Sequence, residues 1–339
     1  MKKQELYIIT NESFNIEKNS FFCDNIDLKS IPEELNKFCK VNIIGRKSKI
    51  KRSKLVKLST IDIFQSIFSF LFFVFKTGFK KKANYLIISL SPYTFLASII
   101  LKILNRKHFI YLRSDGYEEY KSILGFLGSF IYHIMFIVAS LKADLISCRK
   151  HLLKNKQGKI VSPSQLNDKW FNTTNKSNPK KMSLLYVGRL RVEKGIFSLL
   201  KIIDNTNLEL TIITSEKKIS LENKNNNISL ISYENYNDSI IKFYDEHAIF
   251  ILPSYTEAHP QVLDEALARE RPVIVFNEIS HVVRDRKGIF ISERNIESLQ
   301  KNIIHIKNNY DKITNDIKKN ILPKKVNFIN ELKNIILKN

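Results

Sequence analysis

Two carboxylates that flank the start of a helix are the residues best placed for chemistry in this sequence. Glu257 and Glu265 have seven residues between them, inside the segment PSYTEAHPQVLDEALARERP at residues 253–272. Each carboxylate can accept two hydrogen bonds from vicinal hydroxyl groups. The helix follows a Pro-containing loop, and its first backbone N–H groups can hold a phosphate with help from the helix dipole. These N–H groups belong to Gln261, Val262 and Leu263. The segment predicts a pocket for a hydroxyl-rich anion such as a nucleotide-sugar.

A second group of functional residues lies in LLYVGRLRVEKG, residues 184–195. An apolar strand ends at Gly188, and Arg189 and Lys194 follow in the loop before the next helix. Open α/β sheets bind ligands at the carboxyl ends of their strands. Two cations at such an end neutralise a diphosphate and stabilise the charge that develops as it leaves. Either cation alone is typical of a solvated surface loop, but the pair, about 60 residues before the two carboxylates, favours phosphate binding.

These residues are predicted to be positioned by strands and helices that alternate along the whole chain, a pattern typical of parallel α/β domains. In the first half we expect strands at residues 6–10, 41–45, 85–90, 108–112, 144–148 and 159–162, with helices that include 92–104 and 123–141. In the second half we expect strands at 183–188, 208–213, 228–231, 248–252, 273–276 and 288–291, followed by a helical, Lys-rich tail.

A length of 339 residues suits two domains. We predict an N-terminal Rossmann-like domain at 1–165, a polar linker at 166–181, a C-terminal Rossmann-like nucleotide-sugar domain at 182–310 and a helical tail at 311–339.

The two segments together resemble the donor-site signature of retaining GT-B glycosyltransferases, the family called glycosyltransferase group 1 or GT4. The family motif G-R-x-x-x-x-K-G is matched by Gly188, Arg189, Lys194 and Gly195, and the acid-to-Glu-Ala motif is matched by E-A-H-P-Q-V-L-D-E-A. The resemblance is specific over residues 182–291. It implies an α/β protein of the GT-B fold, with two Rossmann-like parallel-sheet domains facing a central cleft.

The resemblance also assigns roles to the residues. It implies that Arg189 and Lys194 contact the donor phosphates, that Glu257 contacts the transferred sugar and that Glu265 binds the ribose hydroxyls. Arg189, Lys194 and Glu257 are the expected catalytic residues. The full expected donor site consists of Gly188, Arg189, Lys194, Glu257, Ala258, His259, Val262, Leu263 and Glu265.

Two residues in this region depart from the family pattern. Ala258 stands where Gly is common, and Glu270 stands where Gly usually ends the helix, so we expect that helix end to be built differently. Asp264, beside Glu265, is expected to point to another face of the helix and to be exposed to solvent. His259 is expected to be structural or to form a wall of the donor-sugar pocket.

Signals for the acceptor are weaker and lie in the first half. Arg113 and Asp115, in YLRSDGYEEY, follow a strand and are our acceptor-side candidates. Asp115 precedes Gly116, so a turn-forming Asp-Gly pair is an equally good interpretation. The segment 11–22, expected to be a loop, lacks the glycines with which relatives admit the acceptor.

A formal net charge of +22 points to an anionic partner, either a membrane surface or an acidic substrate. A Lys-, Asn- and Ile-rich composition with a solvated basic surface is the alternative interpretation. Neither zinc-finger spacing nor an aromatic RNA-binding run supports nucleic acid. No metal site and no cofactor are expected, because the histidines are scattered and Asp-x-Asp is absent, and Arg189 and Lys194 replace a metal's charge. Three isolated cysteines and a start without an apolar leader favour a reducing compartment.

Residues 61–79, IDIFQSIFSFLFFVFKTGF, form an apolar and aromatic segment that Lys80, Lys81 and Lys82 follow. A buried core helix, a membrane-surface helix and a membrane span are all compatible with its sequence, although Asp62, Gln65 and Lys76 argue against a span.

The resemblance implies a retaining hexosyltransferase-type glycosyltransferase. It also implies that the first domain, at 1–165, binds the acceptor and that the tail at 311–339 packs back towards that domain. Such an enzyme would move a sugar from a nucleoside-diphosphate sugar to a glycan or lipid-linked acceptor in bacterial surface polysaccharide or lipopolysaccharide biosynthesis. We expect it in the cytoplasm, peripherally on the cytoplasmic face of the inner membrane. The alternative from another class is a catalytically inactive GT-B-like protein that binds nucleotide-sugar or acts as a scaffold.

Overall fold

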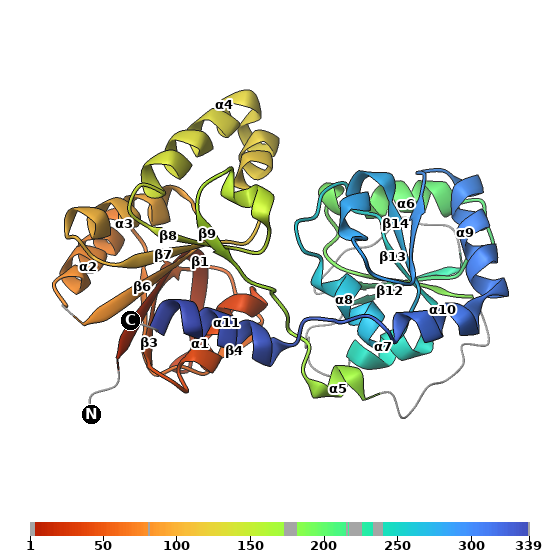
Figure 1. Cartoon of the computed structure of the whole chain (residues 1–339), viewed down its shortest axis with the longest axis horizontal. Coiled ribbons are helices and arrows are strands. Elements are labelled where there is room, and N and C mark those ends of the chain that lie inside the picture. Colours follow the sequence, from red (N-terminus) through yellow and green to blue (C-terminus); the bar gives the residue numbers. More distant parts are fainter. Residues whose placement is uncertain are drawn as a thin grey trace. The chain divides into compact units, whose positions relative to one another are not determined.

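The computed structural model describes residues 4–80, 82–172, 182–214, 216, 226–232 and 240–337. The chain divides into two compact units (Figure 1). Unit 1 comprises Met1–Pro163 and Val326–Asn339, and unit 2 comprises Ser164–Lys325. Residues 173–181 of the expected linker lie outside the described residues.

Unit 1 is built on a mixed sheet whose main part is parallel. Its parallel strands follow the order β5-β3-β1-β6-β7-β8-β9, and β2 and β4 add an antiparallel extension at the far end of β1. The strands are β1 (Glu5–Glu17), β2 (Ser20–Cys23), β3 (Lys40–Lys47), β4 (Lys54–Val56), β5 (Ile61–Phe64), β6 (Ala83–Ile88), β7 (His108–Leu112), β8 (Asp144–Ser147) and β9 (Gly158–Ile160).

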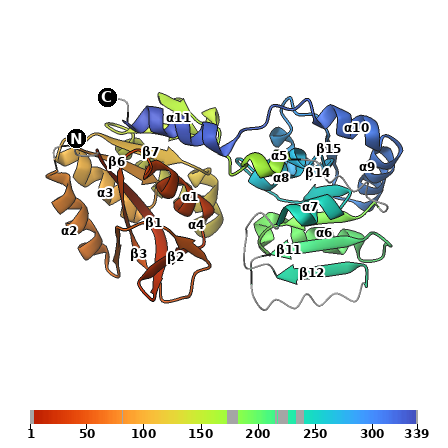
Figure 2. The same cartoon turned by 90° about the horizontal axis from the view of Figure 1, so that it is seen from below.

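Helices cover both faces of this sheet, and the alternation of side chains along β1 shows how. Leu6 and Ile8 pack with α1 (Ile26–Leu35) and α11 (Lys325–Leu337), whereas Tyr7 and Ile9 pack with the other three helices. Those three are α2 (Ile67–Gly78), α3 (Pro92–Ile103) and α4 (Gly116–Ala139). The last helix of the chain, α11, therefore belongs to the core of the first unit (Figure 1 and Figure 2).

Two expectations for unit 1 are wrong. The segment expected to be a loop at 11–22 continues β1 to Glu17 and turns back into β2. The apolar segment 61–79 is not one helix, because β5 ends at Phe64 and α2 has only 12 residues. Ser66 separates the two elements, since its side chain accepts a hydrogen bond from the Ser69 backbone N–H and caps α2. A 12-residue helix is about 18 Å long, too short for a membrane span.

Unit 2 contains a six-stranded parallel sheet with the order β12-β11-β10-β13-β14-β15. The strands are β10 (Leu184–Val187), β11 (Leu210–Thr214), β12 (Ile228–Ser232), β13 (Ile249–Leu252), β14 (Val273–Phe276) and β15 (Ile289–Ser292). The strand order reverses between β10 and β13. In open α/β sheets this switch point, at the carboxyl ends of the strands, is where ligands bind.

The helices of unit 2 are α5 (Asp168–Phe171), α6 (Ile196–Ile203), α7 (Ile241–Glu246), α8 (Gln261–Ala268), α9 (Ile296–Asn308) and α10 (Tyr310–Ile317). The short 3-10 helices are η1 (Lys150–Leu153) in unit 1 and η2 (Val192–Lys194) and η4 (Asn277–Val282) in unit 2. The core of unit 2 is one continuous apolar cluster around β10, β13 and β14.

The end of α8 departs from our expectation. Glu270 adopts the left-handed conformation, with φ of 60°, that Gly normally supplies. The Glu270 N–H bonds to the Leu267 carbonyl at 2.9 Å, and the Arg271 N–H bonds to the Ala266 carbonyl at 2.9 Å. This is the Schellman arrangement, so the helix ends in the family manner although the residue has changed.

We predict that Glu270→Gly raises the free energy of unfolding by about 0.5–1 kcal/mol. Glycine adopts left-handed φ without the steric cost that a Cβ imposes, and this gain exceeds the extra entropy that it loses on folding. Urea unfolding of both proteins measures the difference. Glu270→Ala is the control, because it removes the carboxylate and keeps the Cβ; an equal gain in that variant would contradict the conformational explanation.

Candidate active site

Two loops of unit 2 meet at the switch point of its sheet, one after β10 and one after β13. The Tyr255 N–H donates to the Glu193 carbonyl at 3.0 Å. Gly195 has φ of 66°, and a Cβ on it would lie 1.8 Å from the Pro253 carbonyl oxygen. Only glycine fits at this contact, because both its conformation and the space exclude a side chain. The loop contact sets the positions of the functional side chains that follow.

Lys194 and Glu257 form an ion pair across these loops. Lys194 Nζ lies 2.6 Å from Glu257 Oε1, and the two side chains are only 23% and 12% exposed. Ser254 Oγ donates to the same oxygen at 2.8 Å, and His281 Nε2 donates to the Glu257 backbone carbonyl at 2.7 Å. The carboxylate is therefore held by Lys194 and Ser254, and the backbone of the same residue is held by His281. An anion that binds Lys194 must compete with Glu257 for its ammonium group.

Arg189 lies on the same edge and is exposed. Its carbonyl accepts a 2.7 Å hydrogen bond from Tyr186, and no described residue pairs with its guanidinium group. Burial first, and then the charges of Glu257 and Glu216, raise the pKa of the Tyr186 phenol, while the Arg189 charge lowers it. Tyr186 is thus a neutral support beneath the loop, and Arg189 is a cation available to a ligand.

Glu265 lies in a different environment, because it is 6% exposed and faces the interior of unit 2. Tyr244 donates a hydrogen bond to its Oε2 at 2.7 Å. The pKa of Glu265 is raised to about 7, chiefly by burial; the Tyr244 hydrogen bond lowers it, and the charge of Asp264 adds to the rise. At neutral pH the carboxyl group can therefore exist in either protonation state. Hydroxyl donors of a ligand favour the ionised form.

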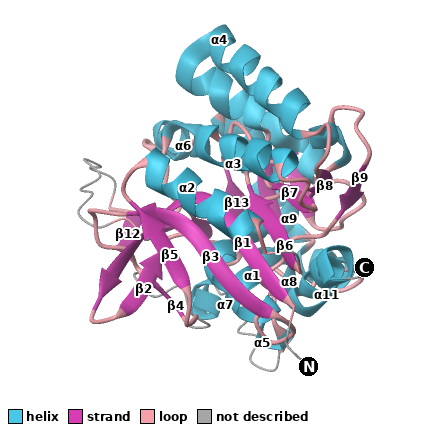
Figure 3. Cartoon of the chain, turned by 90° about the vertical axis from the view of Figure 1, so that its left-hand side faces the viewer, coloured by secondary structure: helices cyan, strands magenta, loops and turns pink. Residues whose placement is uncertain are grey.

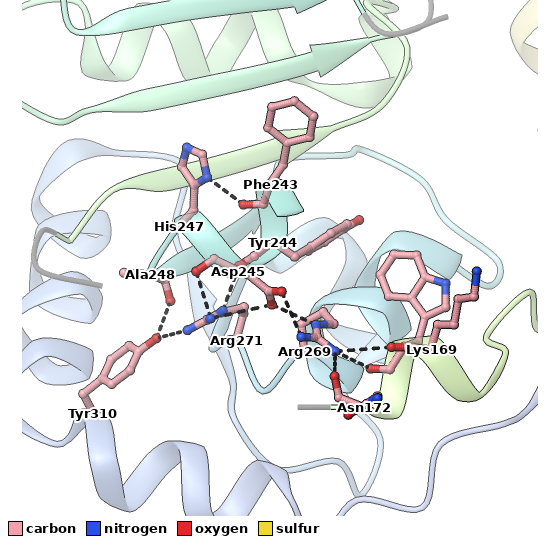
Figure 4. A network of polar contacts seen from close by, with 11 residues as sticks. Lys169, Asn172, Phe243, Tyr244, Asp245, His247, Ala248, Arg269, Arg271 and Tyr310 are labelled. Atoms are coloured by element: carbon pink, nitrogen blue, oxygen red, sulfur yellow. Dashed lines mark hydrogen bonds and ion pairs between the residues drawn. The ribbon is translucent and has the colours of Figure 1, made fainter. Parts of the chain in front are cut away.

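Two arginines that follow Glu265 hold Tyr244 and its neighbour Asp245 in place (Figure 4). Arg271 Nε donates to the Tyr244 carbonyl at 2.8 Å. Arg269 makes a two-point ion pair with Asp245, with both bonds at 2.8 Å, and also donates to the Trp170 carbonyl at 3.1 Å. Helices α5, α7 and α8 are tied together by these bonds, and the position of the Tyr244 phenol follows from them.

Two expectations about the start of α8 are wrong. The Leu263 N–H is not free, because it donates to the Pro260 carbonyl at 3.2 Å. Asp264 is not exposed: it is 2% exposed, pairs with Arg286, and lies 3.2 Å from His259 Nε2. The helix face that carries Asp264 is covered by the segment that contains Arg286, far along the sequence. His259 is buried against Asp264, while Ala258 and Val262 are partly buried.

The acceptor-side candidates lie in unit 1, after β7. Arg113 pairs with Asp27 at 2.9 Å. Asp115 caps α4, because its Oδ1 accepts from the Tyr117 N–H at 3.0 Å and from the Glu118 N–H at 3.4 Å. The capping role favours the turn-forming interpretation of Asp115.

Sequence reasoning did not identify four residues that position the site: Ser254, Tyr244, His281 and Arg294. Arg294 donates to the Pro253 carbonyl at 2.9 Å and stacks 4.1 Å from the Tyr255 ring centroid. It follows β15, about 40 residues after the loop that it supports. Ser254 lies three residues before Glu257, so its role could have been predicted from the motif. The other three residues lie outside both motifs, and nothing in the sequence around them indicates a role in the site. The described residues contain no group of three or more His, Cys, Asp or Glu side chains arranged to hold a metal ion.

Comparisons with known proteins agree with this geometry. Residues 168–322 match the family model of glycosyl transferases group 1. A comparison with curated proteins finds no match. Sucrose-phosphate synthase from Thermosynechococcus elongatus is similar in structure, with a TM-score of 0.66 at 15% identity over 98% of this chain and 95% of that one.

Two further solved structures are similar. HepE from Anabaena, solved with UDP-glucose, has a TM-score of 0.67 at 12% identity over 93% of this chain and 92% of its own. MurG from Acinetobacter baumannii has a TM-score of 0.58 at 11% identity over 99% of this chain and 100% of its own. The predicted fold and the resemblance to group 1 are confirmed: the chain is a glycosyltransferase with the GT-B fold, and its group 1 signature lies in unit 2.

We predict that Glu265→Gln changes how stability depends on pH. The folded-state pKa of Glu265, about 7, lies above the ordinary glutamate value of 4.5, so the folded state binds more protons between these pH values. The wild type therefore loses stability as pH rises from 4.5 to 7, by about 3 kcal/mol in total. Glutamine cannot ionise and still accepts from Tyr244, so the variant avoids this loss.

Urea unfolding at pH 5 and pH 8 measures the effect. The exposed Glu246→Gln, at the end of α7, is the control. It keeps Glu265, so its stability is expected to fall between pH 5 and pH 8 as that of the wild type does. A stability difference between wild type and Glu265→Gln that is the same at both pH values would contradict the raised pKa.

Proposed function

We propose that this chain transfers a sugar from a nucleoside-diphosphate sugar to a hydroxyl group of a glycan or lipid-linked acceptor, with retention of anomeric configuration. The observation that supports this most is the convergence at one sheet edge of Arg189, Lys194 and Glu257, with Glu265 in the helix that follows. Two cations suited to a diphosphate and two carboxylates suited to hydroxyl groups meet the chemical needs of such a donor.

The proposed roles follow from the contacts. Arg189 and Lys194 bind the diphosphate, and Lys194 exchanges its bond to Glu257 for a phosphate oxygen. Glu257, released on that side and still held by Ser254, accepts from hydroxyls of the transferred sugar. Glu265 accepts from the ribose hydroxyls. The bond between the sugar carbon and the diphosphate oxygen breaks while the acceptor oxygen attacks the same face and passes its proton to the departing diphosphate oxygen. The two cations stabilise the leaving charge.

Three further features belong to the proposal. The donor is a nucleotide-sugar, for which the similar HepE structure with UDP-glucose gives support. The reaction needs no metal, because Arg189 and Lys194 supply the positive charge. The pathway is bacterial surface polysaccharide or lipopolysaccharide assembly on the cytoplasmic face of the inner membrane, for which the net charge of +22 gives support.

Measurement of turnover distinguishes this proposal from the alternative, an inactive protein that only binds the donor. That alternative is favoured by the structural roles of both acceptor-side candidates, because Asp115 caps α4 and Arg113 pairs with Asp27. The protein is incubated with UDP-, GDP- and ADP-sugars and a bacterial lipid extract, with and without EDTA. We expect release of one nucleoside diphosphate, unchanged by EDTA, and a product whose anomeric proton shows the configuration of the donor. Donor binding without any turnover would favour the inactive protein, and an inverted product would contradict retention.

We predict that Arg189→Ala lowers kcat/KM for the donor by about 10- to 100-fold. A hydrogen bond to a charged group contributes about 1.5–3 kcal/mol, and each 1.4 kcal/mol is about tenfold in rate. The fold is expected to survive, because no described residue pairs with this guanidinium group.

Arg191→Ala is the matched control. It removes the same charge two residues away, from a side chain that is 60% exposed and paired with Glu216. We expect less than a twofold change in kcat/KM for this variant. Equal losses in both variants would show that overall charge, and not contact with the diphosphate, is responsible.

A further inference from the structure

Helix α4 is a helical hairpin, not a rod. Gly125 breaks it with φ of 63° and ψ of −149°. Ser129 Oγ donates to the Tyr117 carbonyl at 3.0 Å, and the Tyr117 and Phe136 ring centroids lie 6.0 Å apart. In one continuous helix residues 117 and 136 would lie about 28 Å apart. The limbs 116–124 and 126–139 therefore double back on each other, whereas the sequence had predicted a single helix at 123–141.

Glycines allow this reversal. The Gly125 conformation is one that residues with a side chain avoid, and a Cβ on Gly128 would lie 2.0 Å from the Tyr120 carbonyl oxygen. The two limbs meet through a pair of tyrosines, with the Tyr120 and Tyr132 ring centroids 5.3 Å apart and the ring planes tilted by 46°. The hairpin is thus a packed element with a defined end.

That end, the hairpin tip, consists of Ile123, Leu124, Phe126 and Leu127. Their exposed fractions are 73%, 55%, 83% and 68%. Four large apolar side chains beside one another on a projecting turn (Figure 3) are unusual on a surface that meets only water. The tip therefore predicts contact with an apolar environment.

The hairpin does not cross a bilayer in this conformation. The segment Gly116–Ala139 is the one described helix that is long and apolar enough for a span by length and composition. Its limbs, however, are about 14 Å and 21 Å long, shorter than the hydrocarbon core of about 30 Å. Partial insertion of the tip fits these dimensions.

Helix α2 carries a second apolar stripe on the same side of the sheet. Phe68, Phe72, Phe75 and Phe79 are exposed at helical spacing and together form the α2 stripe. Helix α3 packs between α2 and α4, so all three helices form one layer (Figure 3). An apolar stripe and an apolar tip from one layer suit a broad partner better than a pocket-sized ligand.

The charge around this layer decides which partner. Between Asp62 and Asp115, a stretch that contains α2 and α3, the chain has no acidic residue and eight Lys or Arg residues, whereas α4 carries Glu118, Glu119 and Lys121. Residues 1–163 hold 28 Lys and Arg against 12 Asp and Glu, which is +16 of the net +22. Exposed Lys76, Lys82 and Lys107 lie at or just beyond the ends of α2 and α3. A second copy of this chain would bring like charge, whereas an anionic lipid surface brings the opposite charge.

We propose that unit 1 docks on an anionic bilayer through the hairpin tip of α4 and the α2 stripe. The tip enters the interfacial region, the phenylalanines of the stripe lie among the headgroups and upper acyl chains, and the lysines contact anionic headgroups. This inference rests on the membrane location in the proposed function and specifies which residues make the contact. The docking surface does not include any donor-site residue.

Vesicle sedimentation tests the inference with the whole protein. The vesicles are phosphatidylcholine alone or phosphatidylcholine with about 30% phosphatidylglycerol, a content that gives an anionic surface. We expect at least about tenfold tighter binding to the anionic vesicles, reversed by high salt. Phe126→Ser with Leu127→Ser is expected to lose about tenfold or more, while Ile321→Ser, at a 99% exposed position in unit 2, is expected to bind like the wild type.

A second measurement reports how deeply the hairpin tip enters the bilayer. It shows that weaker vesicle binding of the serine variants does not result from misfolding. The chain has one tryptophan, Trp170, which is buried, so Phe126→Trp adds a distinct signal. We expect its emission to shift to the blue with anionic vesicles and to be quenched by brominated lipids. Unchanged emission, or a soluble dimer that the tip substitutions dissociate, would overturn the inference. If the protein releases nucleoside diphosphate but does not bind vesicles, the membrane-docking inference is overturned, whereas the proposed sugar transfer is retained.

Discussion

The close contact of Gly195 with the Pro253 carbonyl is the constraint on which the candidate site depends. It brings the loop after β10 against the loop after β13, and the Lys194–Glu257 pair follows from that proximity. The strand order puts the two loops beside each other, because β10 and β13 are neighbours at the point where the order reverses. A side chain at position 195 would separate the loops and with them the cation and the acid.

The two carboxylates of the site differ because their surroundings differ. Glu257 lies at the edge of the sheet beside a lysine, where its charge is compensated. Glu265 lies inside unit 2 with a phenol as its partner, where burial raises its pKa to about 7. The network of Arg269, Arg271 and Asp245 keeps that phenol in place (Figure 4). In the proposed function, Glu257 therefore meets hydroxyls of the transferred sugar beside a cation, and Glu265 meets the ribose hydroxyls from a buried position.

Much of this structure could be predicted from the sequence, because its strongest signals are local. Apolar strands such as β7 and β14 were predicted at their observed bounds, and the loop residues after β10 carry a recognisable motif. The failures concern partners that are distant in sequence. Asp264 is buried because Arg286 covers it, and Tyr244 reaches Glu265 only through the fold. The hairpin in α4 escaped prediction because its apolar pattern continues across Gly125, and only the backbone conformation reveals the turn.

The claim that unit 2 holds a nucleoside-diphosphate sugar is tested most directly by a thermal-shift panel of UDP-, GDP- and ADP-sugars on the wild type and on Glu265→Ala. We expect one nucleotide class to raise the Tm of the wild type and to lose that effect in the variant, which would also identify the base. Equal stabilisation of both proteins by every donor, or no stabilisation of the wild type by any, would contradict the assignment of Glu265 and its neighbours to the donor.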